Sequence, residues 1–408
     1  MKYLNPIAAG TAPQPGQGSE ETLGIAPHPF LFEQPQPNPD WEARPRRILM
    51  TTAGHRRQWE HDLDLAAALG RCGIEVALAV LGHAPSRQQL DRAYRHSNVQ
   101  VYQGQFGGSW SDDAWGDVER AGDWLVRLEH SLEPDLVHLH AYPLGSLPFR
   151  APHLLAGHDC PVCRWRALQG DAPRFPWRRY MEAATEAFRS ARLVVVPTAA
   201  ALQELTGLFG LLPDTRLIPA GRSARGLLPG SKEELILAAG SYAGGGAGLE
   251  TVEQVAGTVD WPVVILAEGT EHPVASDGSV RIVDRPSPDS IASWYGRTSV
   301  YAQPCRYTAS GLGPLEAALA GCALVLGDVP ALRETWEGAA LFVQPGDPLD
   351  LSRALELLLS EPKGLRGLAQ RARSRALLFS PERRAGAFLE AYADVVAGEV
   401  RPRRAEAS

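Results

Sequence analysis

Short apolar runs alternate with amphipathic segments over most of this chain, beginning near residue 46. Such runs, rich in Val, Leu and Ile and bounded by Gly, Pro or Asp, are typical of strands buried on both faces. In the first half we expect strands at residues 47–51, 75–81, 99–102, 136–140, 193–197 and 217–219. Helices are expected at residues 59–69, stopped by Gly70, and at 117–132. Strands that alternate with helices predict a parallel sheet.

The second half repeats this alternation after a Gly- and Pro-containing loop at residues 221–231, which is the natural linker. Strands are expected at residues 234–240, 263–267, 280–283, 299–302 and 323–326. Helices are expected at residues 348–359, with Asp347 as N-cap and Pro348 at the first position, at 363–378, and from about 381. The pattern therefore predicts an α/β protein with two Rossmann-like, doubly wound domains.

The two ends of the chain differ from this pattern. Residues 1–45 are rich in Pro, Gln, Gly and acidic side chains and carry only short apolar islands, which is typical of a flexible arm. Those islands are also compatible with docking on this chain or on a partner. Residues 401–408 form a polar tail that we expect to be frayed.

Composition narrows the class of protein. The chain has 408 residues, of which 44% are hydrophobic and 21% charged, enough for two domains with separate cores. Its formal net charge of −7 implies no general affinity for nucleic acid or anionic membranes. We expect no transmembrane helix and no signal peptide, hence a cytoplasmic protein.

Five cysteines in a reducing compartment favour free thiols. Cys160 and Cys163 form a C-x-x-C motif with His158 just upstream. A redox or zinc role needs a thioredoxin-like context or a fourth ligand at suitable spacing, and the sequence offers neither. Buried free thiols are the favoured interpretation, and no metal site is suggested.

Residues 301–345 carry the most informative motif. An apolar run ends near Ala302, a loop leads to Gly311, a helix carries Glu316 near its start, and Gly321 closes that helix. The free N–H groups at the start of such a helix suit a phosphate, and a Glu one turn in can reach sugar hydroxyls. A nucleotide-sugar site is one interpretation, and a carboxylate stabilised by the helix dipole is the simpler one.

This stretch resembles the donor-site segment of bacterial retaining glycosyltransferases of the family 4 type. These have the GT-B fold, so the resemblance implies two Rossmann-like domains facing each other across a cleft. Gly311, Leu312, Leu315 and Glu316 fit the family's pattern, whereas Thr308 stands where the first of its two glutamates is usual. The resemblance extends from about residue 47 to 396. It implies an acceptor domain over 46–222, a nucleotide-sugar domain over 223–380 and a C-terminal helix, 381–400, that crosses back onto the first domain.

The resemblance also implies a Gly-Gly pair in the loop after the first strand, where the backbone approaches the donor diphosphate. Here Gly54 is followed by Arg56 and Arg57 at the Gly-Gly positions. Their bulk would fill the space of the diphosphate or sugar. Alternatively, two guanidinium groups could bind that diphosphate, or both could be solvated surface side chains.

The family's phosphate clamp, an Arg and a Lys, is also replaced. Ser241 stands at the Arg position and Ala247 at the Lys position, so both cations are missing. Gly244 and Gly245 could form an anion-binding nest of backbone N–H groups, or could simply reflect relaxed selection on a phosphate clamp that has been lost. Arg222 of the family's Asn-Gly-Arg segment remains, although its Asn is Ala220.

Three histidines are candidates for an acceptor-side role. His138 and His140 lie at the end of a predicted strand and alternate onto one face, and His158 resembles the family's His-Ser-Cys stretch. Each could act as a general base or hydroxyl ligand, or could be a packed structural side chain.

Two hypotheses follow. The first is a glycosyltransferase-like protein with a degenerate donor site that serves as a non-catalytic or weakly active partner of another protein, an active transferase or a second copy of itself. The second is an active retaining glycosyltransferase that moves a sugar from a nucleoside-diphosphate (NDP) sugar to an acceptor hydroxyl, with Arg56, Arg57 and Arg222 as an atypical phosphate clamp. Neither requires a cofactor beyond the NDP-sugar donor.

Overall fold

The computed structural model describes residues 44–107, 110–157, 159–170, 177–242, 246–268, 279–284 and 286–398. All of them belong to one compact unit of the chain. Several predictions concern residues outside these ranges: the arm up to residue 43, His158, Gly244, Gly245 and the tail 401–408.

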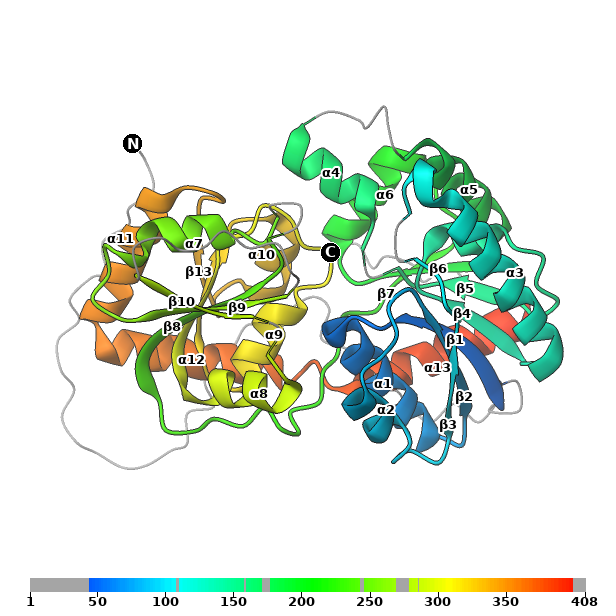
Figure 1. Ribbon diagram of the computed structural model, residues 1–408, viewed down its shortest axis with the longest axis horizontal. Coiled ribbons are helices and arrows are strands. Elements are labelled where there is room, and N and C mark those ends of the chain that lie inside the picture. The colour runs from blue at the N-terminus through cyan, green and yellow to red at the C-terminus, as the bar shows by residue number, and fades with distance from the viewer. Residues whose placement is uncertain are drawn as a thin grey trace, which may run out of the picture. The chain divides into compact units, whose positions relative to one another are not determined.

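The N-terminal domain is built on a seven-stranded parallel sheet with the order β3-β2-β1-β4-β5-β6-β7 (Figure 1). Its strands are β1 (Arg47–Ala53), β2 (Glu75–Leu81), β3 (Val99–Gln103), β4 (Leu136–Leu139), β5 (His153–Leu155), β6 (Leu193–Val196) and β7 (Thr215–Leu217). Its helices are α1 (Arg56–Gly70), α2 (Arg87–Ala93), α3 (Trp115–Leu132), α4 (Pro161–Gln169), α5 (Arg178–Ser190) and α6 (Ala199–Phe209), with short 3₁₀ turns at Asp112–Ala114 and Tyr142–Ser146. The strand order reverses beside β1, and ligands of doubly wound sheets bind at such a point.

The C-terminal domain has a six-stranded parallel sheet with the order β10-β9-β8-β11-β12-β13. Its strands are β8 (Glu233–Gly240), β9 (Val263–Ala267), β10 (Val280–Asp284), β11 (Thr298–Gln303), β12 (Ala323–Gly327) and β13 (Leu341–Val343). Its helices are α7 (Leu249–Ala256), α8 (Pro288–Arg297), α9 (Leu312–Leu319), α10 (Pro330–Trp336), α11 (Pro348–Ser360) and α12 (Pro362–Ala376). Here the order reverses between β8 and β11, so the start of α9 lies at the corresponding switch point.

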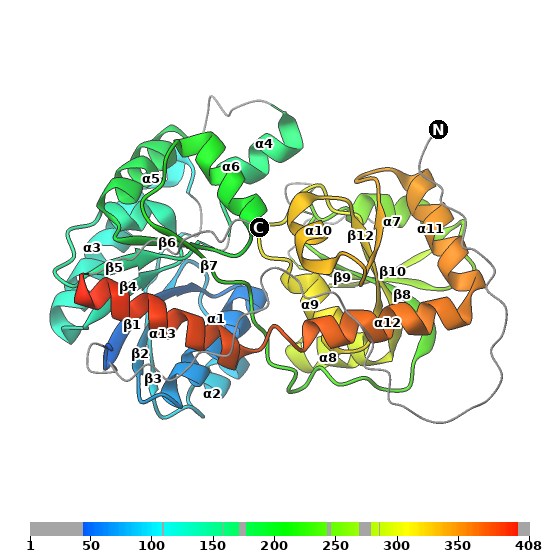
Figure 2. The same cartoon turned by 180° about the vertical axis from the view of Figure 1, so that it is seen from behind.

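The last helix, α13 (Pro381–Ala397), packs against the N-terminal domain (Figures 1 and 2). Its Phe388 and Tyr392 share a buried cluster with Trp59 of α1 and with residues of β1 and β2. The chain enters α13 close to the linker, because a Cβ added to Gly221 would lie 2.9 Å from the carbonyl oxygen of Ser380. Glycine at 221 is what allows this approach.

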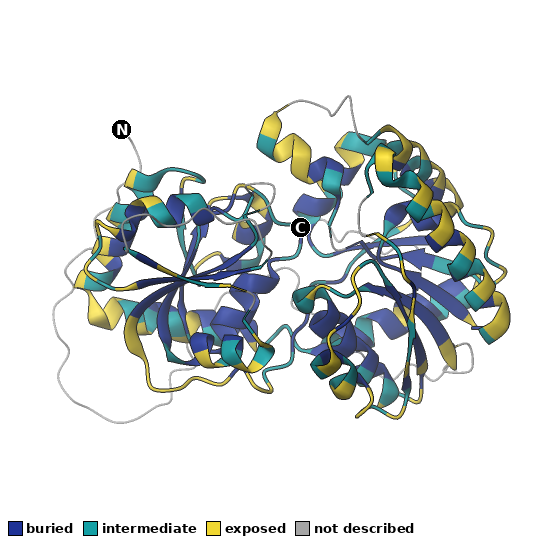
Figure 3. Ribbon diagram, in the orientation of Figure 1, coloured by how far each residue is buried: buried dark blue, intermediate teal, exposed yellow. Residues whose placement is uncertain are grey.

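Both sheets are buried on their two faces, whereas the outer faces of the helices are exposed (Figure 3). Ile48, Leu49 and Met50 of β1 are all fully buried, which explains why the strands appear in the sequence as continuous apolar runs rather than alternating ones. The predicted α/β class with two doubly wound domains is confirmed.

Most predicted elements match the structure within a few residues, and Asp347 caps α11 as predicted, accepting from the N–H groups of Leu349 and Asp350. One prediction was wrong in a way that matters: α1 begins at Arg56 rather than at Trp59. Its first turn is polar, so the apolar spacing used to predict the helix starts only one turn later. Within the described ranges, no helix is both long and apolar enough to cross a membrane.

Candidate functional site

The loop between β1 and α1 leads into two arginines. A Cβ on Gly54 would lie 1.8 Å from the carbonyl oxygen of His83, so no side chain fits there. His55 is the N-cap residue, and Arg56 and Arg57 are the first two residues of α1. The two positions where the resemblance implies Gly-Gly therefore belong to the first helical turn, and their side chains emerge from the carboxyl-end edge of the sheet.

The start of α9 carries Glu316. Gly311 precedes the helix with φ +61°, a conformation that favours glycine, and its N–H donates to the Thr308 hydroxyl at 3.1 Å. Thr308, which stands where the family has its first glutamate, thus fixes the loop that leads into α9. Leu312 is buried, and Glu316 is fully buried.

Both carboxylate oxygens of Glu316 accept from guanidinium groups. Arg56 donates from Nη1 to Oε1 at 3.4 Å and from Nη2 to Oε2 at 3.2 Å, and Arg222 donates from Nε to Oε1 at 3.0 Å. The Nε of Arg57 lies 3.7 Å from Oε2. A carboxylate of the C-terminal domain is therefore enclosed by cations of the N-terminal domain and the linker.

Glu268 is a second acceptor for the same arginines. It follows β9 directly, and its N–H donates to the Gly240 carbonyl at 2.7 Å. Its Oε1 lies 3.4 Å from Nη2 of Arg56 and 3.2 Å from Nη2 of Arg57. Sequence reasoning missed Glu268, although a polar residue at the end of an apolar strand is the signal that singled out His138 and His140.

Arg222 is held on its other side by α1. Its Nη1 donates to Oδ2 of Asp64, which also accepts from the Ser223 N–H at 2.9 Å, and its Nη2 lies 3.6 Å from Oε2 of Glu60. Glu60 and Asp64 are one turn apart on α1 and were also missed from the sequence. We call these side chains the arginine–carboxylate cluster: Arg56, Arg57, Arg222, Glu60, Asp64, Glu268 and Glu316.

The charges in the cluster stabilise one another. Burial alone would raise the pKa of Glu316, but the guanidinium groups of Arg56, Arg222 and Arg57 outweigh burial and lower that pKa to about 2. Burial opposes the charge of Arg222 as well, and Asp64, Glu316 and Glu60 raise its pKa despite this. Glu316 and the three arginines are therefore charged at neutral pH, in a region where the Glu316 side chain is only 1% exposed.

The corresponding segment of the C-terminal domain, between β8 and α7, carries no cation at the two positions where the resemblance implies them. Ser241 and Ala247 stand there. Gly246 accepts from the Arg306 N–H at 3.2 Å, and Gly248, the N-cap of α7, has φ +76° and passes close to the Pro304 carbonyl. The described part of this segment therefore packs on the loop after β11.

His138 and His140 are both buried, with ring centroids 4.5 Å apart. Nδ1 of His138 lies 2.7 Å from the Tyr392 hydroxyl of α13, so the ring faces the returning helix. The His140 N–H donates to the Thr51 hydroxyl at 2.8 Å, and its Nδ1 contacts the Thr51 carbonyl. These contacts fit the structural alternative for the two rings, and His158 lies outside the described residues.

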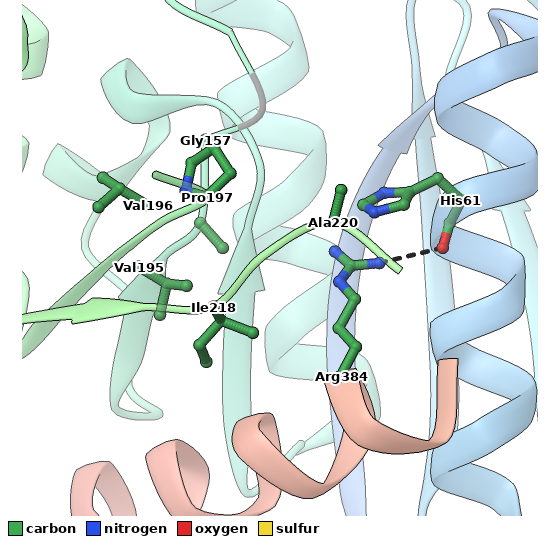
Figure 4. A pocket seen from close by; sticks show the side chains of 9 residues that line it. His61, Gly157, Val195, Val196, Pro197, Ile218, Ala220 and Arg384 are labelled. Carbon is green, nitrogen blue, oxygen red and sulfur yellow. Dashed lines mark hydrogen bonds between the residues drawn. The ribbon is translucent and has the colours of Figure 1, made fainter. Parts of the chain in front are cut away.

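A buried polar group beside these rings escaped the sequence reasoning. Asp62 of α1 is fully buried, accepts from the Thr52 hydroxyl at 2.8 Å, and lies 3.5 Å from Nε2 of His140 and 3.4 Å from Nδ1 of His61. In Figure 4, Arg384 reaches from α13 toward His61, whose carbonyl oxygen it binds at 3.1 Å. A charged residue amid the apolar positions of α1 was the available signal.

Two cavities border this region, and both are small. The one in Figure 4 is lined by His61, Gly157, Ala220 and Arg384 and has a volume of about 10 Å³. The other, between Thr198, Ala220 and Gly311, also has a volume of about 10 Å³. Each holds about one water molecule, far less than a nucleotide sugar needs.

Known proteins resemble this chain in family and in fold. Residues 60–223 match the family Glycosyltransferase Family 4, and residues 243–361 match Glycosyl transferases group 1. No curated protein sequence matches the chain.

Solved structures match nearly the whole described chain. Sucrose-phosphate synthase from Thermosynechococcus elongatus superposes with a TM-score of 0.73 at 16% identity, covering 87% of this chain and 100% of that one. Anabaena HepE, solved in complex with UDP and glucose, gives 0.67 at 15% identity over 85% and 99% of the two chains. WaaG, a glycosyltransferase involved in lipopolysaccharide biosynthesis, gives 0.64 at 14% identity over 86% and 100%. The fold and these matches identify the chain as a glycosyltransferase-like protein that resembles the family 4 type and has the GT-B fold.

Proposed function

We propose that this glycosyltransferase-like protein fills its donor position with its own arginine–carboxylate cluster and acts as a non-catalytic or weakly catalytic partner of another protein. The observation that carries the proposal is the pairing of both Glu316 oxygens with Arg56 and Arg222. That carboxylate is the group the resemblance assigns to the donor ribose. An active glycosyltransferase or a second copy of this chain are the candidate partners.

The energetics of the cluster support this proposal. A ribose hydroxyl would compete with Arg56 and Arg222, which already donate to both oxygens of Glu316. Removing one partner of a buried ion pair costs about 3–5 kcal/mol, because the other charge is left uncompensated. A ribose hydroxyl is neutral and cannot replace a guanidinium, so the closed arrangement is favoured over nucleotide binding.

The missing clamp supports it as well. Transfer from an NDP-sugar releases a diphosphate, and stabilising that charge is usually a dominant part of catalysis. Each charge-assisted hydrogen bond contributes about 1.5–3 kcal/mol, and Ser241 and Ala247 offer no cation for one. Thr308 cannot supply charge in place of the family's first glutamate, and its hydroxyl is bound to the Gly311 N–H.

The alternative is an active retaining glycosyltransferase in which Arg56, Arg57 and Arg222 clamp the diphosphate. One observation favours it: Arg56 and Arg57 do face the start of α9, where such a phosphate would lie. HepE structures contain UDP or UDP-glucose, so a nucleotide sugar is the donor class to test. The burial of His138 and His140 gives this alternative no acceptor-side base among the described candidates. The cytoplasmic location stays a prediction.

Calorimetric titration separates the two functions. The full-length protein is titrated with UDP, GDP and ADP and with their common sugar conjugates, alongside Glu316→Ala and the surface control Glu337→Ala. We expect no micromolar binding to any of them, with a cooperative thermal melt showing that the protein is folded. Micromolar binding of one nucleotide that is lost in Glu316→Ala and kept in Glu337→Ala would overturn the proposal in favour of the active enzyme.

A further inference from the structure

Cys160 and Cys163 lie at the start of α4 in a context that the sequence did not reveal. Cys160 is the N-cap residue with extended backbone, Pro161 is the first helical residue, and the Cys163 N–H donates to the Cys160 sulfur at 3.3 Å. The Cys160 side chain is therefore folded back over the first turn, toward the side of the helix that carries Cys163. Two cysteines three residues apart in this geometry can be joined without moving the backbone far.

Besides this bond, the Cys163 thiol and the Tyr180 hydroxyl act on the pKa of the Cys160 sulfur as hydrogen-bond donors. These donors, with the Cys163 thiol foremost, lower the pKa of Cys160, whereas the same bond raises the pKa of Cys163, which keeps its proton. The position at a helix N-terminus also favours negative charge on Cys160. Cys160 is thus the nucleophile of the first step, and Cys163 is the thiol that attacks the Cys160 sulfur in the second.

One side chain of the C-terminal domain packs on the buried cluster that contains this pair. Tyr307, in the loop between β11 and α9, packs against the N-terminal cluster that contains both cysteines. Cys160 is 3% exposed and Cys163 6%. Tyr307 immediately precedes Thr308, so the segment that shields the thiols also forms the approach to the donor position.

We propose that Cys160 and Cys163 are a redox-active dithiol, oxidised to an intrachain disulfide by a low-molecular-weight disulfide when the Tyr307 segment withdraws from the N-terminal domain. This site is independent of whether the donor position binds a nucleotide. The structure confirms the interpretation from sequence that these residues are buried free thiols, and the proposal adds a redox role to it. Transient disulfides of this kind are the type found in reducing compartments.

The chemistry is a thiol–disulfide exchange in two steps. The Cys160 thiolate attacks one sulfur of a glutathione disulfide, forming a mixed disulfide and releasing one glutathione thiolate. Cys163 then loses its proton, attacks the Cys160 sulfur and releases the second glutathione. The proton of Cys163 passes to the glutathione thiolate released in the first step. Two protein thiols are oxidised and one small disulfide is reduced.

The other cysteines lack this arrangement. Burial raises the pKa of Cys305 and of Cys322 to about 11. Cys322 donates to the Tyr295 and Thr298 carbonyls, and Cys72 is half-buried. Cys305 and Cys322 serve as internal controls for protected thiols, and Cys72 serves as the control for an accessible one.

The first test is mass spectrometry of the full chain equilibrated in mixtures of reduced and oxidised glutathione, then alkylated and digested. We expect two of the five cysteines to escape alkylation together, in one peptide that carries a Cys160–Cys163 disulfide. Cys163→Ser should instead accumulate glutathione on Cys160, and Cys160→Ser should leave Cys163 reduced. If the wild-type pair stays fully alkylated while Cys72 forms a mixed disulfide, the proposal is wrong.

The second test asks whether the Tyr307 segment limits access to Cys160 and Cys163. Tyr307→Ala should form the disulfide severalfold faster than wild type at the same glutathione ratio, whereas the exposed control Tyr94→Ala should not. Thermal melts of both variants show whether each remains folded. Equal rates in Tyr307→Ala and wild type, with both folded, would overturn the role of the Tyr307 segment.

Discussion

The two loops that follow the first strand of each domain have exchanged their charges relative to the family pattern. The loop after β1, where the resemblance implies two glycines, leads into Arg56 and Arg57. The segment after β8, where the resemblance implies two cations, has Ser241 and Ala247. Positive charge is thus present at this edge, but it comes from the N-terminal domain instead of the C-terminal one.

The difference changes what the positive charge binds. A cation on the β8 segment would face the donor diphosphate from the side of the nucleotide domain. Arg56 and Arg57 instead reach across from α1 and bind Glu316 and Glu268 of the C-terminal domain. The two arginines therefore hold the two domains together through ion pairs. Glu316, the carboxylate expected at the ribose, is part of that contact.

Breaking the cluster at its centre should have the largest effect. Glu316→Ala removes the buried carboxylate that Arg56 and Arg222 share, and we expect a loss of about 3–5 kcal/mol in the free energy of unfolding, measured by urea denaturation. If Glu316 served only a ligand, the unliganded protein would be unaffected. A loss below about 1 kcal/mol in Glu316→Ala would contradict the account.

The pH dependence of stability should show the same pairing. The folded pKa of Glu316, about 2, lies below its ordinary value of 4.5, so its contribution is present above pH 4.5 and is lost as the pH falls from 4.5 toward 2. The expected loss is on the order of 3 kcal/mol. Comparing wild type with Glu316→Gln by denaturation at several pH values isolates it, since the variant lacks this titration. Parallel profiles of unfolding free energy against pH for the two proteins would show that the pKa of Glu316 is not lowered.

Glu204 sharpens the comparison because it is a partly buried carboxyl whose pKa is raised by burial, to about 7. Below pH 4.5 both states are protonated, and between pH 4.5 and 7 only the unfolded chain loses its proton, so stability should fall as the pH rises through this window. We expect Glu204→Gln to flatten that slope, with a smaller effect than at Glu316 because Glu204 is partly solvated. The exposed control Glu186→Gln should keep the wild-type slope; an unchanged slope in Glu204→Gln would contradict the prediction.

The smallest effect is expected at an exposed arginine with two carboxylate partners. Arg333 donates to Asp328 at 2.7 and 2.6 Å and to Glu337 at 2.7 Å, but its side chain is 44% exposed. Surface pairs contribute about 0–1 kcal/mol, so Arg333→Ala should change urea stability by no more than that. Similar losses in Arg333→Ala and Glu316→Ala would show that burial of the cluster adds nothing.

The sequence allowed the fold to be predicted because strands buried on both faces produce apolar runs, as at β2 and β9. Short edge elements such as β13, and helices with few apolar positions such as α8, gave too little periodicity. The start of α1 was missed for the same reason, since a turn beginning Arg-Arg carries no apolar signal.

The site was only partly predictable. Arg56, Arg57, Arg222 and Glu316 were singled out because they occupy positions of a known pattern. That Glu316 binds those arginines depends on how the two domains meet. Arg56 and Glu316 are 260 positions apart in the sequence, and no local pattern encodes such a contact. Glu60, Asp64 and Glu268 were missed because the resemblance assigns those positions no role.

The most direct measurement is a calorimetric titration of UDP, GDP and ADP into wild type and into a variant that reverses the exchange of charges: Arg56→Gly, Arg57→Gly, Ser241→Arg and Ala247→Lys. The account predicts no micromolar binding by wild type and a gain of binding to one nucleotide in the folded variant, because the Arg56 and Arg57 side chains are gone and the phosphate cations are restored. Micromolar binding by wild type that is lost in the variant would contradict it, since Arg56 and Arg57 would then be the phosphate clamp.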